Sequence, residues 1–284
     1  MDLLAFIIWN PNEVAFSIGP FSIRWYSLCW LVGLIIAYIL VKKIYKDLKI
    51  SEDLFDPLFI YCFFGILIGA RLGHCLFYEP DYFLSSFDHI IEMFVPIHKM
   101  SDGSWVFTGY EGLASHGGTL GLMIALFIYC KRTKLSLLKV LDIIAIATPT
   151  TACFIRLGNL MNSEIIGKVT DLPWGFIFLN ASEGLTSQPR HPGQLYEAIA
   201  YFIFFFIGWY FYRKHKEKVG TGFFFGLCLF LIFTARFFIE FTKINQVDFE
   251  NSLPLDMGQL LSIPFVLLGL YCMIRSKNKE EIIG

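Results

Sequence analysis

The sequence predicts an all-α integral membrane protein, a bundle of seven transmembrane helices with a small extracytoplasmic (periplasmic) cap. Its composition is the first indication: 56% of the 284 residues are apolar, 18% are aromatic and the mean hydropathy is +0.59. Only 17% are charged, whereas soluble domains carry about 25%. The net charge of -1 and the scattered basic residues give no surface for nucleic acid.

The lengths of the apolar segments are the second indication. A hydrocarbon core about 30 Å thick requires about 20 apolar residues in a helix. The segments that meet this requirement are residues 22–41, 57–78, 112–130, 138–160, 194–212, 220–241 and 256–275. Because no flexible linker or low-complexity tract separates them, we expect residues 1–284 to form a single transmembrane catalytic domain.

The basic clusters are the third indication, and they predict the orientation. Each odd-numbered segment is followed by a cluster: Lys42, Lys43, Lys46 and Lys49; Lys131, Arg132 and Lys134; Arg213, Lys214, Lys216 and Lys218; Arg275, Lys277 and Lys279. Cytoplasmic loops are enriched in such residues. We therefore expect the amino terminus outside (periplasmic) and the carboxyl terminus in the cytoplasm.

The long outer loops would then be residues 79–111 and 161–193. Within the second loop, Trp174 to Leu179 reads WGFIFL, which has the composition of a strand and predicts the small cap. The amino terminus lacks the basic start and small-residue cleavage site of a signal peptide, so we expect no cleaved targeting segment.

The cysteines favour core packing over chemistry. They form no C-x-x-C pair and all fall in or beside apolar segments: Cys29, Cys62, Cys75, Cys130, Cys153, Cys228 and Cys272. No cysteine and histidine have the spacing of zinc ligands. We expect neither a metal nor an organic cofactor.

Several charged residues lie inside the apolar segments: Arg71, His116, Asp142, Arg156, Arg236 and Glu240. A charge at the centre of a transmembrane helix costs about 2.5 to 3.5 kcal/mol, so such residues face a cavity or the bundle interior. Asp142 begins its segment on the cytoplasmic side, where a carboxylate complements a helix amino terminus, and we interpret it as structural. The others are expected near the outer ends of their helices.

These charges have a structural and a functional interpretation. Arg236 and Glu240 are four residues apart and could simply pair on one helix face. However, three arginines together with Asn159 and Asn162 give an excess of positive charge, which favours an anionic ligand. Arginine binds phosphate through a planar fork of donors, and a phospholipid head group is the commonest anion at that depth.

Glycines accompany some of these charges. Gly65, Gly69 and Gly73 have the four-residue spacing that lets another helix approach closely. His116 is followed by Gly117 and Gly118, which would clear space for a ligand. The alternative is that His116 is an ordinary packed histidine.

Motifs along nearly the whole chain carry a resemblance to one family. They are IRWYSLCWLVG (Ile23 to Gly33), GARLGHCLFYEP (Gly69 to Pro80), SHGGTLG (Ser115 to Gly121), RLGNLMNSEIIGKVTDLPWG (Arg156 to Gly175), RHPGQLYEA (Arg190 to Ala198), ARFFIEF (Ala235 to Phe241) and MGQLLSIP (Met257 to Pro264). In this order and spacing the sequence resembles the prolipoprotein diacylglyceryl transferases of bacterial inner (cytoplasmic) membranes.

The resemblance implies an enzyme of the first step of bacterial lipoprotein maturation. Such an enzyme transfers the diacylglyceryl group of phosphatidylglycerol to the lipobox cysteine thiol of a preprolipoprotein. A thioether forms and glycerol 1-phosphate leaves. The implied partners are phosphatidylglycerol, preprolipoprotein signal peptides with a lipobox cysteine, and membrane lipid.

The resemblance also implies roles for matching residues. It places His116 and Tyr26 near the reacting groups and Arg156 and Arg236 at the phosphate, as catalytic residues. It also implies that Arg156, Asn159, Glu164 and Gly167 bind the head group. From the residues themselves we expect further substrate-binding roles for Arg71, Asn162, Gly117, Gly118 and Glu240, the last as a residue that positions Arg236.

The sequence departs from the family pattern at three positions. Ser163 stands where many members have glycine, and Gly193 stands where many have serine. Ile232 stands one turn before Arg236, where some members carry a tyrosine. Any role of that phenol must be absent or relocated here.

Three other function classes remain open from the residues. A transporter or flippase for an anionic lipid would also place arginines in a membrane cavity. An intramembrane serine protease would use Ser115, but neighbouring Ser115 and His116 point to different faces of a helix and cannot form a dyad directly. A purely structural scaffold leaves the motifs unexplained.

Overall fold

The computed structural model describes residues 6–19, 21–95, 97–100, 103–107, 112–181, 187–244 and 255–283. The chain divides into two compact units, each described here by itself. Unit 1 consists of Met1–Ile44 with Leu141–Gly284, and unit 2 consists of Tyr45–Val140. That residues 1–284 form one domain stays a prediction.

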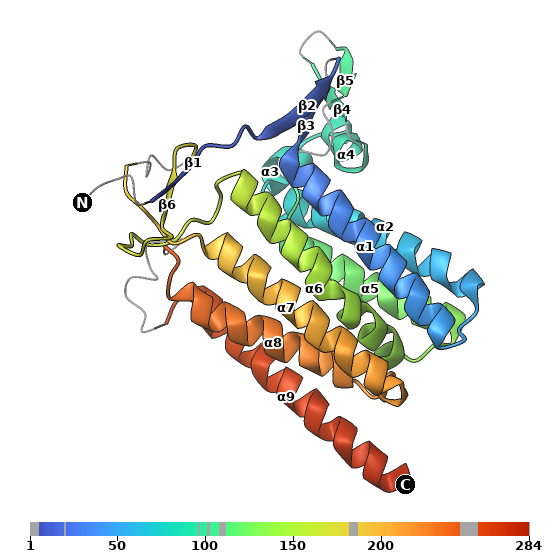
Figure 1. Ribbon diagram of the computed structural model, residues 1–284. Coiled ribbons are helices and arrows are strands. Elements are labelled where there is room, and N and C mark those ends of the chain that lie inside the picture. Colours follow the sequence, from blue (N-terminus) through green and yellow to red (C-terminus); the bar gives the residue numbers. More distant parts are fainter. Residues whose placement is uncertain are drawn as a thin grey trace. The chain divides into compact units, whose positions relative to one another are not determined.

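Unit 1 is built mainly from long helices. They are α1 (Trp25–Asp47), α6 (Leu137–Met161), α7 (Gly193–Lys214), α8 (Phe223–Glu240) and α9 (Met257–Ile283), with the short 3-10 helix η3 (Lys216–Lys218) before α8. In Figure 1, α6 to α9 lie side by side, and the ends of α6 and α8 lie at the same end of the unit as the starts of α7 and α9. Polar residues near these four ends are therefore brought together.

Short strands lie at that end of unit 1. Strand β1 (Ile7–Trp9) pairs in parallel with β6 (Phe176–Phe178), with Ile7 opposite Phe176 and Trp9 opposite Phe178. The strand predicted within WGFIFL is thus confirmed, and it is fully buried. Its aromatic side chains pack with Leu160 and Ile166 in one apolar cluster. That these strands form a periplasmic cap stays a prediction.

A hairpin that the sequence did not predict precedes α1. Strand β2 (Val14–Ile18) pairs antiparallel with β3 (Phe21–Arg24), and the register shifts between Val14 and Phe16. Residues 14–18 and 22–24 of this hairpin are all exposed or half-buried. A short half-exposed hairpin gives little periodic signal, because few of its positions have to be apolar.

Unit 2 contains two long helices and several short elements. The long helices are α2 (Phe55–Phe77) and α5 (Ser115–Thr133). The short elements are η2 (Glu52–Leu54), α3 (Pro80–Phe83), α4 (Phe87–Phe94) and the antiparallel strands β4 (Ile97–Lys99) and β5 (Trp105–Phe107). They lie before α2 or within the segment predicted as an outer loop.

Glycines bring α2 and α5 into backbone contact, as the four-residue spacing predicted. A Cβ atom added at Gly69 would lie 2.8 Å from the Cα atom of Gly121, and one at Gly73 would lie 2.7 Å from the Cα atom of Gly117. Gly117 is therefore required for helix packing. The α2 backbone lies directly beside it, and the expectation that it also clears space for a ligand around His116 stays a prediction.

Six helices are long and apolar enough to cross a membrane among the residues described. They are α1, α6, α7, α8, the stretch Glu52–Phe77 that includes α2, and Met257–Ser276 within α9. The remaining predicted segment, 112–130, forms helix α5 but is not one of the six. Its first turn contains serine, histidine and two glycines, which lower its hydropathy. The chain thus has the helices of a multi-pass membrane protein, and the seventh crossing stays a prediction.

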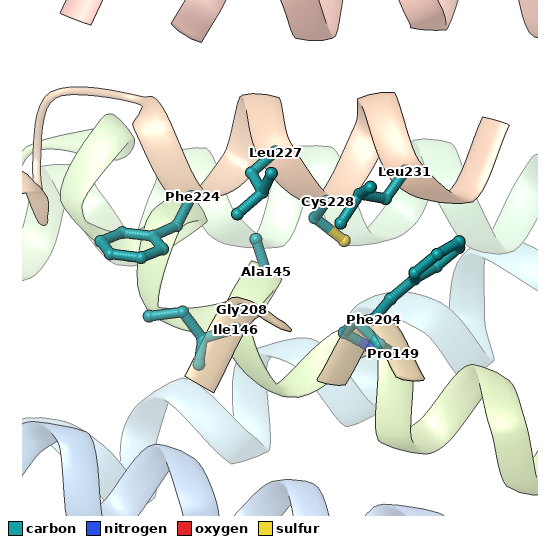
Figure 2. Close-up of a pocket in the computed structure, with 9 residues that line it drawn as sticks. All are labelled: Ala145, Ile146, Pro149, Phe204, Gly208, Phe224, Leu227, Cys228 and Leu231. Carbon is teal, nitrogen blue, oxygen red and sulfur yellow. The ribbon is translucent and has the colours of Figure 1, made fainter. Parts of the chain in front are cut away.

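A small apolar hollow lies between α6, α7 and α8 in unit 1 (Figure 2). Its lining residues are Ala145, Ile146, Pro149, Phe204, Gly208, Phe224, Leu227, Cys228 and Leu231. None of its described lining residues is charged, so we interpret it as imperfect packing beside Pro149 rather than as the site of the chemistry. The cysteines, all within the described residues, form no disulfide.

Asp142 has the structural role expected, but for a different helix. Its fully buried carboxylate accepts hydrogen bonds from the backbone N–H groups of Gly220, Gly222 and Phe225, at 2.8, 2.9 and 2.8 Å. These groups belong to the amino-terminal end of α8. The expectation that Asp142 complements its own helix is therefore corrected: it satisfies the N–H groups of α8, which have no partner within that helix.

Candidate functional site

Arg156 lies in the last turns of α6 and makes polar contacts with Glu197, Asn159 and Tyr201. Its Nε atom lies 2.7 Å from Glu197 Oε2 in an ion pair, and its Nη1 atom donates to Asn159 Oδ1 at 3.3 Å. The Arg156 side chain is 17% exposed and that of Glu197 is fully buried. The guanidinium is thus oriented from the protein side and is still reachable from outside.

An amide network extends this site past the end of α6. Asn159 Nδ2 donates to Glu164 Oε2 at 2.7 Å, and Asn162 Nδ2 donates to Glu164 Oε1 at 2.9 Å. Gln194 Nε2 donates to the backbone oxygen of Glu164. The exposed carboxylate of Glu164 is therefore held at both oxygens, which gives this turn one defined conformation. The structure brings together the predicted residues Arg156, Asn159, Asn162 and Glu164.

The backbone on both sides of Glu164 is left-handed. Ser163 has φ +54° and Ile165 has φ +56°. Such values are uncommon outside glycine, and for a β-branched residue such as Ile165 they mark a true outlier. Strain of this kind costs about 1 to 3 kcal/mol per residue and is concentrated at functional sites. The glycine that many family members have at position 163 would adopt this conformation without strain.

Tyr26 lies against the same part of α6. A Cβ atom added at Gly158 would lie 2.9 Å from Tyr26 Cδ2 and 3.3 Å from its Cα atom, so the two helices approach closely there. The phenol of Tyr26 interacts electrostatically with Glu164 and Arg156. The structure therefore brings Tyr26 to the predicted site.

Gly167 contributes through its backbone. A Cβ atom there would lie 2.5 Å from His191 Cβ and 2.6 Å from the Thr242 oxygen. Its N–H donates to the His191 oxygen at 2.9 Å, and the next residue, Lys168, donates to the Thr242 oxygen at 2.7 Å. Any larger residue at position 167 would push apart the backbone at His191 and Thr242. We call these contacting backbone segments the floor of the site.

Two charged residues of the site were missed by the sequence reasoning. Lys243 Nζ lies 3.0 Å from Glu197 Oε1 and 3.0 Å from Glu240 Oε2. The expected pairing of Arg236 with Glu240 is therefore wrong, because Glu240 pairs with Lys243. Glu197 lies within the predicted segment 194–212, so the rule that found the other intramembrane charges would have found it too. Lys243 lies just past a predicted segment and carried no such signal.

Arg236 is half-buried and lies on α8. In the part of the chain that the structure describes, its guanidinium has no hydrogen bond or ion pair, and its electrostatic influence reaches the buried phenol of Tyr201. Tyr201 also interacts with Arg156 and Glu197. Arg236 is thus a cation available to an anion. Ile232, one turn earlier, packs against the cluster that contains Tyr201, so α7 supplies a phenol near the position where some family members carry one.

His191 and its neighbours lie beside this region. His191 Nδ1 is 3.0 Å from the Tyr196 hydroxyl, to which Trp174 Nε1 donates at 3.0 Å. Burial lowers the pKa of His191 below its ordinary value. The imidazole is therefore neutral at neutral pH and acts as a hydrogen-bonding group. Arg190, also buried, donates to the Gly167 oxygen at 3.3 Å.

Arg71 has a structural environment within unit 2. It is 8% exposed, its Nη2 atom donates to the Glu92 oxygen at 2.8 Å and its Nε atom donates to the Met93 oxygen at 3.4 Å. Its guanidinium lies 4.8 Å from the centre of the Phe83 ring. Arg71 thus holds the last turn of α4, and a role in substrate binding stays a prediction.

His116 lies in the first turn of α5 and is exposed. Among the described residues its imidazole has no hydrogen bond or ion pair. The interpretation as a packed core histidine is therefore wrong, and the ring is accessible to a ligand. A Cβ atom at Gly118 would make ordinary contacts with Ala70 and Ile66, so this glycine is not needed for close packing. The side chain of Ser115 lies outside the described residues.

Comparisons with known proteins show the family of this chain. Residues 13–275 match the family described as prolipoprotein diacylglyceryl transferase. A relative from Bacteroides fragilis, named phosphatidylglycerol–prolipoprotein diacylglyceryl transferase, is 59% identical over 281 residues, which cover 99% of each chain. Relatives of the same name from Tolumonas auensis and Chloroherpeton thalassium are each 40% identical and cover 96% and 99% of this chain and 99% and 98% of their own. The chain belongs to the prolipoprotein diacylglyceryl transferase family.

Proposed function

We propose that this chain transfers the diacylglyceryl group of phosphatidylglycerol to the lipobox cysteine of a preprolipoprotein, the first step of lipoprotein maturation. The observation that carries the proposal is the Arg156 site: a guanidinium fixed by Glu197 and Asn159, beside a held carboxylate, in a chain 59% identical to a relative named for this activity. Such a site binds an anionic head group at the end of a membrane helix.

The reaction forms a carbon–sulfur bond and breaks a carbon–oxygen bond. The cysteine sulfur attacks the glycerol carbon that bears the phosphate, and glycerol 1-phosphate leaves with the bonding electrons. A cysteine thiol has an ordinary pKa of about 8.5, so a base must take its proton. The exposed imidazole of His116 is the base in this proposal. Tyr26 orients the reacting groups or relays the proton.

The leaving phosphate gains negative charge as the carbon–oxygen bond breaks. Arg156 and Arg236 stabilise this charge, the first through its fixed orientation and the second through a guanidinium that has no ion pair among the described residues. Loss of one such preorganised donor typically lowers kcat by about 10²- to 10³-fold. Asn159, Asn162 and Glu164 shape the head-group pocket, and Gly167 keeps its floor closed.

The membrane arrangement follows the basic clusters. In this proposal α5 makes the seventh crossing, the amino terminus is periplasmic and the carboxyl terminus is cytoplasmic, in the bacterial inner membrane. The Arg156 site then faces the outer leaflet, where an exported precursor presents its cysteine, and β1 with β6 forms a periplasmic cap over it.

The test is a transfer assay with purified protein. Phosphatidylglycerol labelled in its acyl chains is incubated with a lipobox peptide, and we expect label on the peptide but none on a peptide with serine in place of the cysteine. Lipid that changes leaflet without labelling the peptide would instead support an anionic-lipid transporter.

Variants assign the roles in the same assay. His116→Ala, Arg156→Ala and Arg236→Ala should each abolish transfer while the protein still inserts into the membrane. Arg213→Ala, which removes an exposed arginine at the end of α7, is the matched control and should transfer normally. Full activity of any of the first three would refute the role given to that residue.

A further inference from the structure

Four charged side chains form a chain that links α6 to the turn after α8. Arg156 Nε lies 2.7 Å from Glu197 Oε2, Glu197 Oε1 lies 3.0 Å from Lys243 Nζ, and Lys243 Nζ lies 3.0 Å from Glu240 Oε2. The side chains of Glu197 and Lys243 are 0% and 4% exposed. The reaction proposed above uses Arg156, fixed by Glu197, but gives no role to Lys243.

Lys243 is fixed at both its backbone and its ammonium group. Its backbone forms a bridge with Gly167, the floor residue of the site. Its aliphatic part passes the first residue of α7, since a Cβ atom at Gly193 would lie 3.4 Å from Lys243 Cγ. In Figure 1 the end of α6, the start of α7 and the end of α8 lie together, which is why one lysine can reach both carboxylates.

The charges within this chain balance, so Lys243 is poorly suited to bind phosphate itself. Its ammonium group lies between the carboxylates of Glu197 and Glu240 and is almost fully buried. A phosphate would have to displace one of these carboxylates into a low-dielectric environment, where an unpaired charge is costly.

The arrangement of Glu197 controls how Arg156 can pair. A carboxylate with both oxygens available binds a guanidinium through two parallel hydrogen bonds and so occupies two of its nitrogens. Here Oε1 is held by Lys243, and only Oε2 is left for Arg156, at its Nε atom. The Nη atoms, which lie farther out on the side chain, are not consumed by Glu197.

We propose that Lys243 is a positioning residue: it holds one oxygen of Glu197 and thereby keeps Glu197 from pairing with the Nη atoms of Arg156, which the phosphate of the lipid substrate would bind. The proposal deepens the proposed function and rests on it. Without Lys243, Glu197 would turn its free oxygen to Arg156 and compete with the phosphate for the same donors.

The test compares variants of Lys243 in the transfer assay, with kcat and KM for phosphatidylglycerol measured in micelles of varied lipid fraction. Lys243→Met should raise KM and lower kcat/KM by about tenfold or more, the equivalent of one charged hydrogen bond. Lys243→Arg, which can still hold Oε1, should retain activity near that of the wild type. Lys214→Met, which removes an exposed lysine at the other end of α7, is the control for charge alone.

A double variant distinguishes positioning from the other roles. In Lys243→Met with Glu197→Gln, the competing carboxylate is gone, so KM should recover toward the wild-type value. If Lys243 bound phosphate directly, KM would stay high in the double variant. If its role were only structural, the thermal midpoint of Lys243→Met would fall while KM, normalised to folded protein, would not change.

Each outcome decides the proposal separately from the function. A wild-type protein that transfers no label refutes the proposed function. A wild type that transfers, with Lys243→Met unchanged in KM or with no recovery in the double variant, refutes the positioning role alone. If Lys243→Met does not fold, Lys243→Gln replaces it: its amide still donates to Glu197, so KM should rise less than threefold, and a larger increase would overturn the proposal.

Discussion

Ser163 offers a direct test of whether the site stores backbone strain. Its backbone is in the left-handed region, with φ of +54°, and the residue is only 2% exposed. Its Oγ atom has no hydrogen-bond partner among the described residues. Replacement by glycine removes both unfavourable features, so we expect Ser163→Gly to be active and more stable.

The magnitude follows from opposing contributions. The left-handed conformation costs an L-residue about 1 to 2 kcal/mol, and a buried hydroxyl without a partner costs about 1 to 3 kcal/mol. Against this, glycine gains about 0.4 to 1 kcal/mol of freedom in the unfolded chain, and the lost buried carbon costs about 0.8 kcal/mol. We expect a net stabilisation of about 1 kcal/mol or somewhat more.

The assay is the thermal midpoint in detergent at one scan rate, followed by tryptophan fluorescence. A gain of about 1 kcal/mol corresponds to about 2 to 4 °C for a chain of about 150 to 250 residues. Ser163→Ala is the matched control, because it removes the hydroxyl but keeps the Cβ atom. Ser163→Gly should melt above Ser163→Ala, and the difference measures the backbone strain.

Two results would refute this reasoning. If Ser163→Gly melts below Ser163→Ala, the left-handed backbone is not strained in the way the φ angle implies. If both variants lose transfer activity, the serine hydroxyl has a function in this chain that the glycine of other family members cannot have.

Three further predictions concern positions outside the ligand pocket. Gly208→Ala should raise the thermal midpoint, because an added Cβ atom meets no atom within 4 Å and alanine is favoured over glycine by about 1 kcal/mol in a helix. Gly226→Ala should lower the thermal midpoint, because its Cβ atom would lie 2.7 Å from the Gly269 oxygen. Asp142→Ala should lower the thermal midpoint, because three backbone donors lose their acceptor and each charged hydrogen bond contributes about 1.5 to 3 kcal/mol. Equal midpoints for Asp142→Ala and the wild type would contradict this role of Asp142. The stability of the wild type should fall as the pH drops below about 6.5, because the unfolded chain then binds a proton that folded His191, with its lowered pKa, does not bind. When the thermal midpoint is measured from pH 8 to pH 5, it should change less steeply with pH in His191→Gln than in the wild type.

The helices could be predicted from the sequence, because bilayer thickness imposes a length that hydropathy reveals. All seven predicted segments are helices, although their ends differ by a few residues, and α9 continues to Ile283. The strands were harder to predict. Only the strand in WGFIFL was expected, since β1 pairs with a segment far along the chain and its three residues show no period of their own.

The site could be predicted in its residues but not in its pairing. Arg156, Asn159 and Glu164 were identified through intramembrane charge and the family motif, and the structure connects them by hydrogen bonds. The pairing of Glu240 was predicted from helical spacing with Arg236. Lys243 competes for the same carboxylate from the turn after the helix, and no rule of helical spacing extends past the end of a helix.

The role of a glycine in a membrane helix was also difficult to predict from the sequence. A glycine in a membrane helix permits either close helix approach or access of a ligand, and the sequence alone cannot distinguish the two. Gly117 was assigned to the ligand, yet the α2 backbone occupies the space beside it. At Gly118, one position later, an added Cβ atom would meet its neighbours only at ordinary distances of 3.4 to 3.5 Å. Neighbouring positions on a helix face different directions, so one glycine can serve packing and the next can serve access.

The pairing within the buried chain explains how an ion-paired arginine can still bind an anion. Arg156, Glu197, Lys243 and Glu240 carry two positive and two negative charges, so together they orient one guanidinium without adding net charge to the site. In the proposed mechanism, the attraction for an anionic head group then comes from Arg236, the guanidinium without an ion pair in the described part of the chain. In this proposal Arg156 orients the bound head group and Arg236 provides the net positive charge. Neither arginine is therefore expected to replace the other.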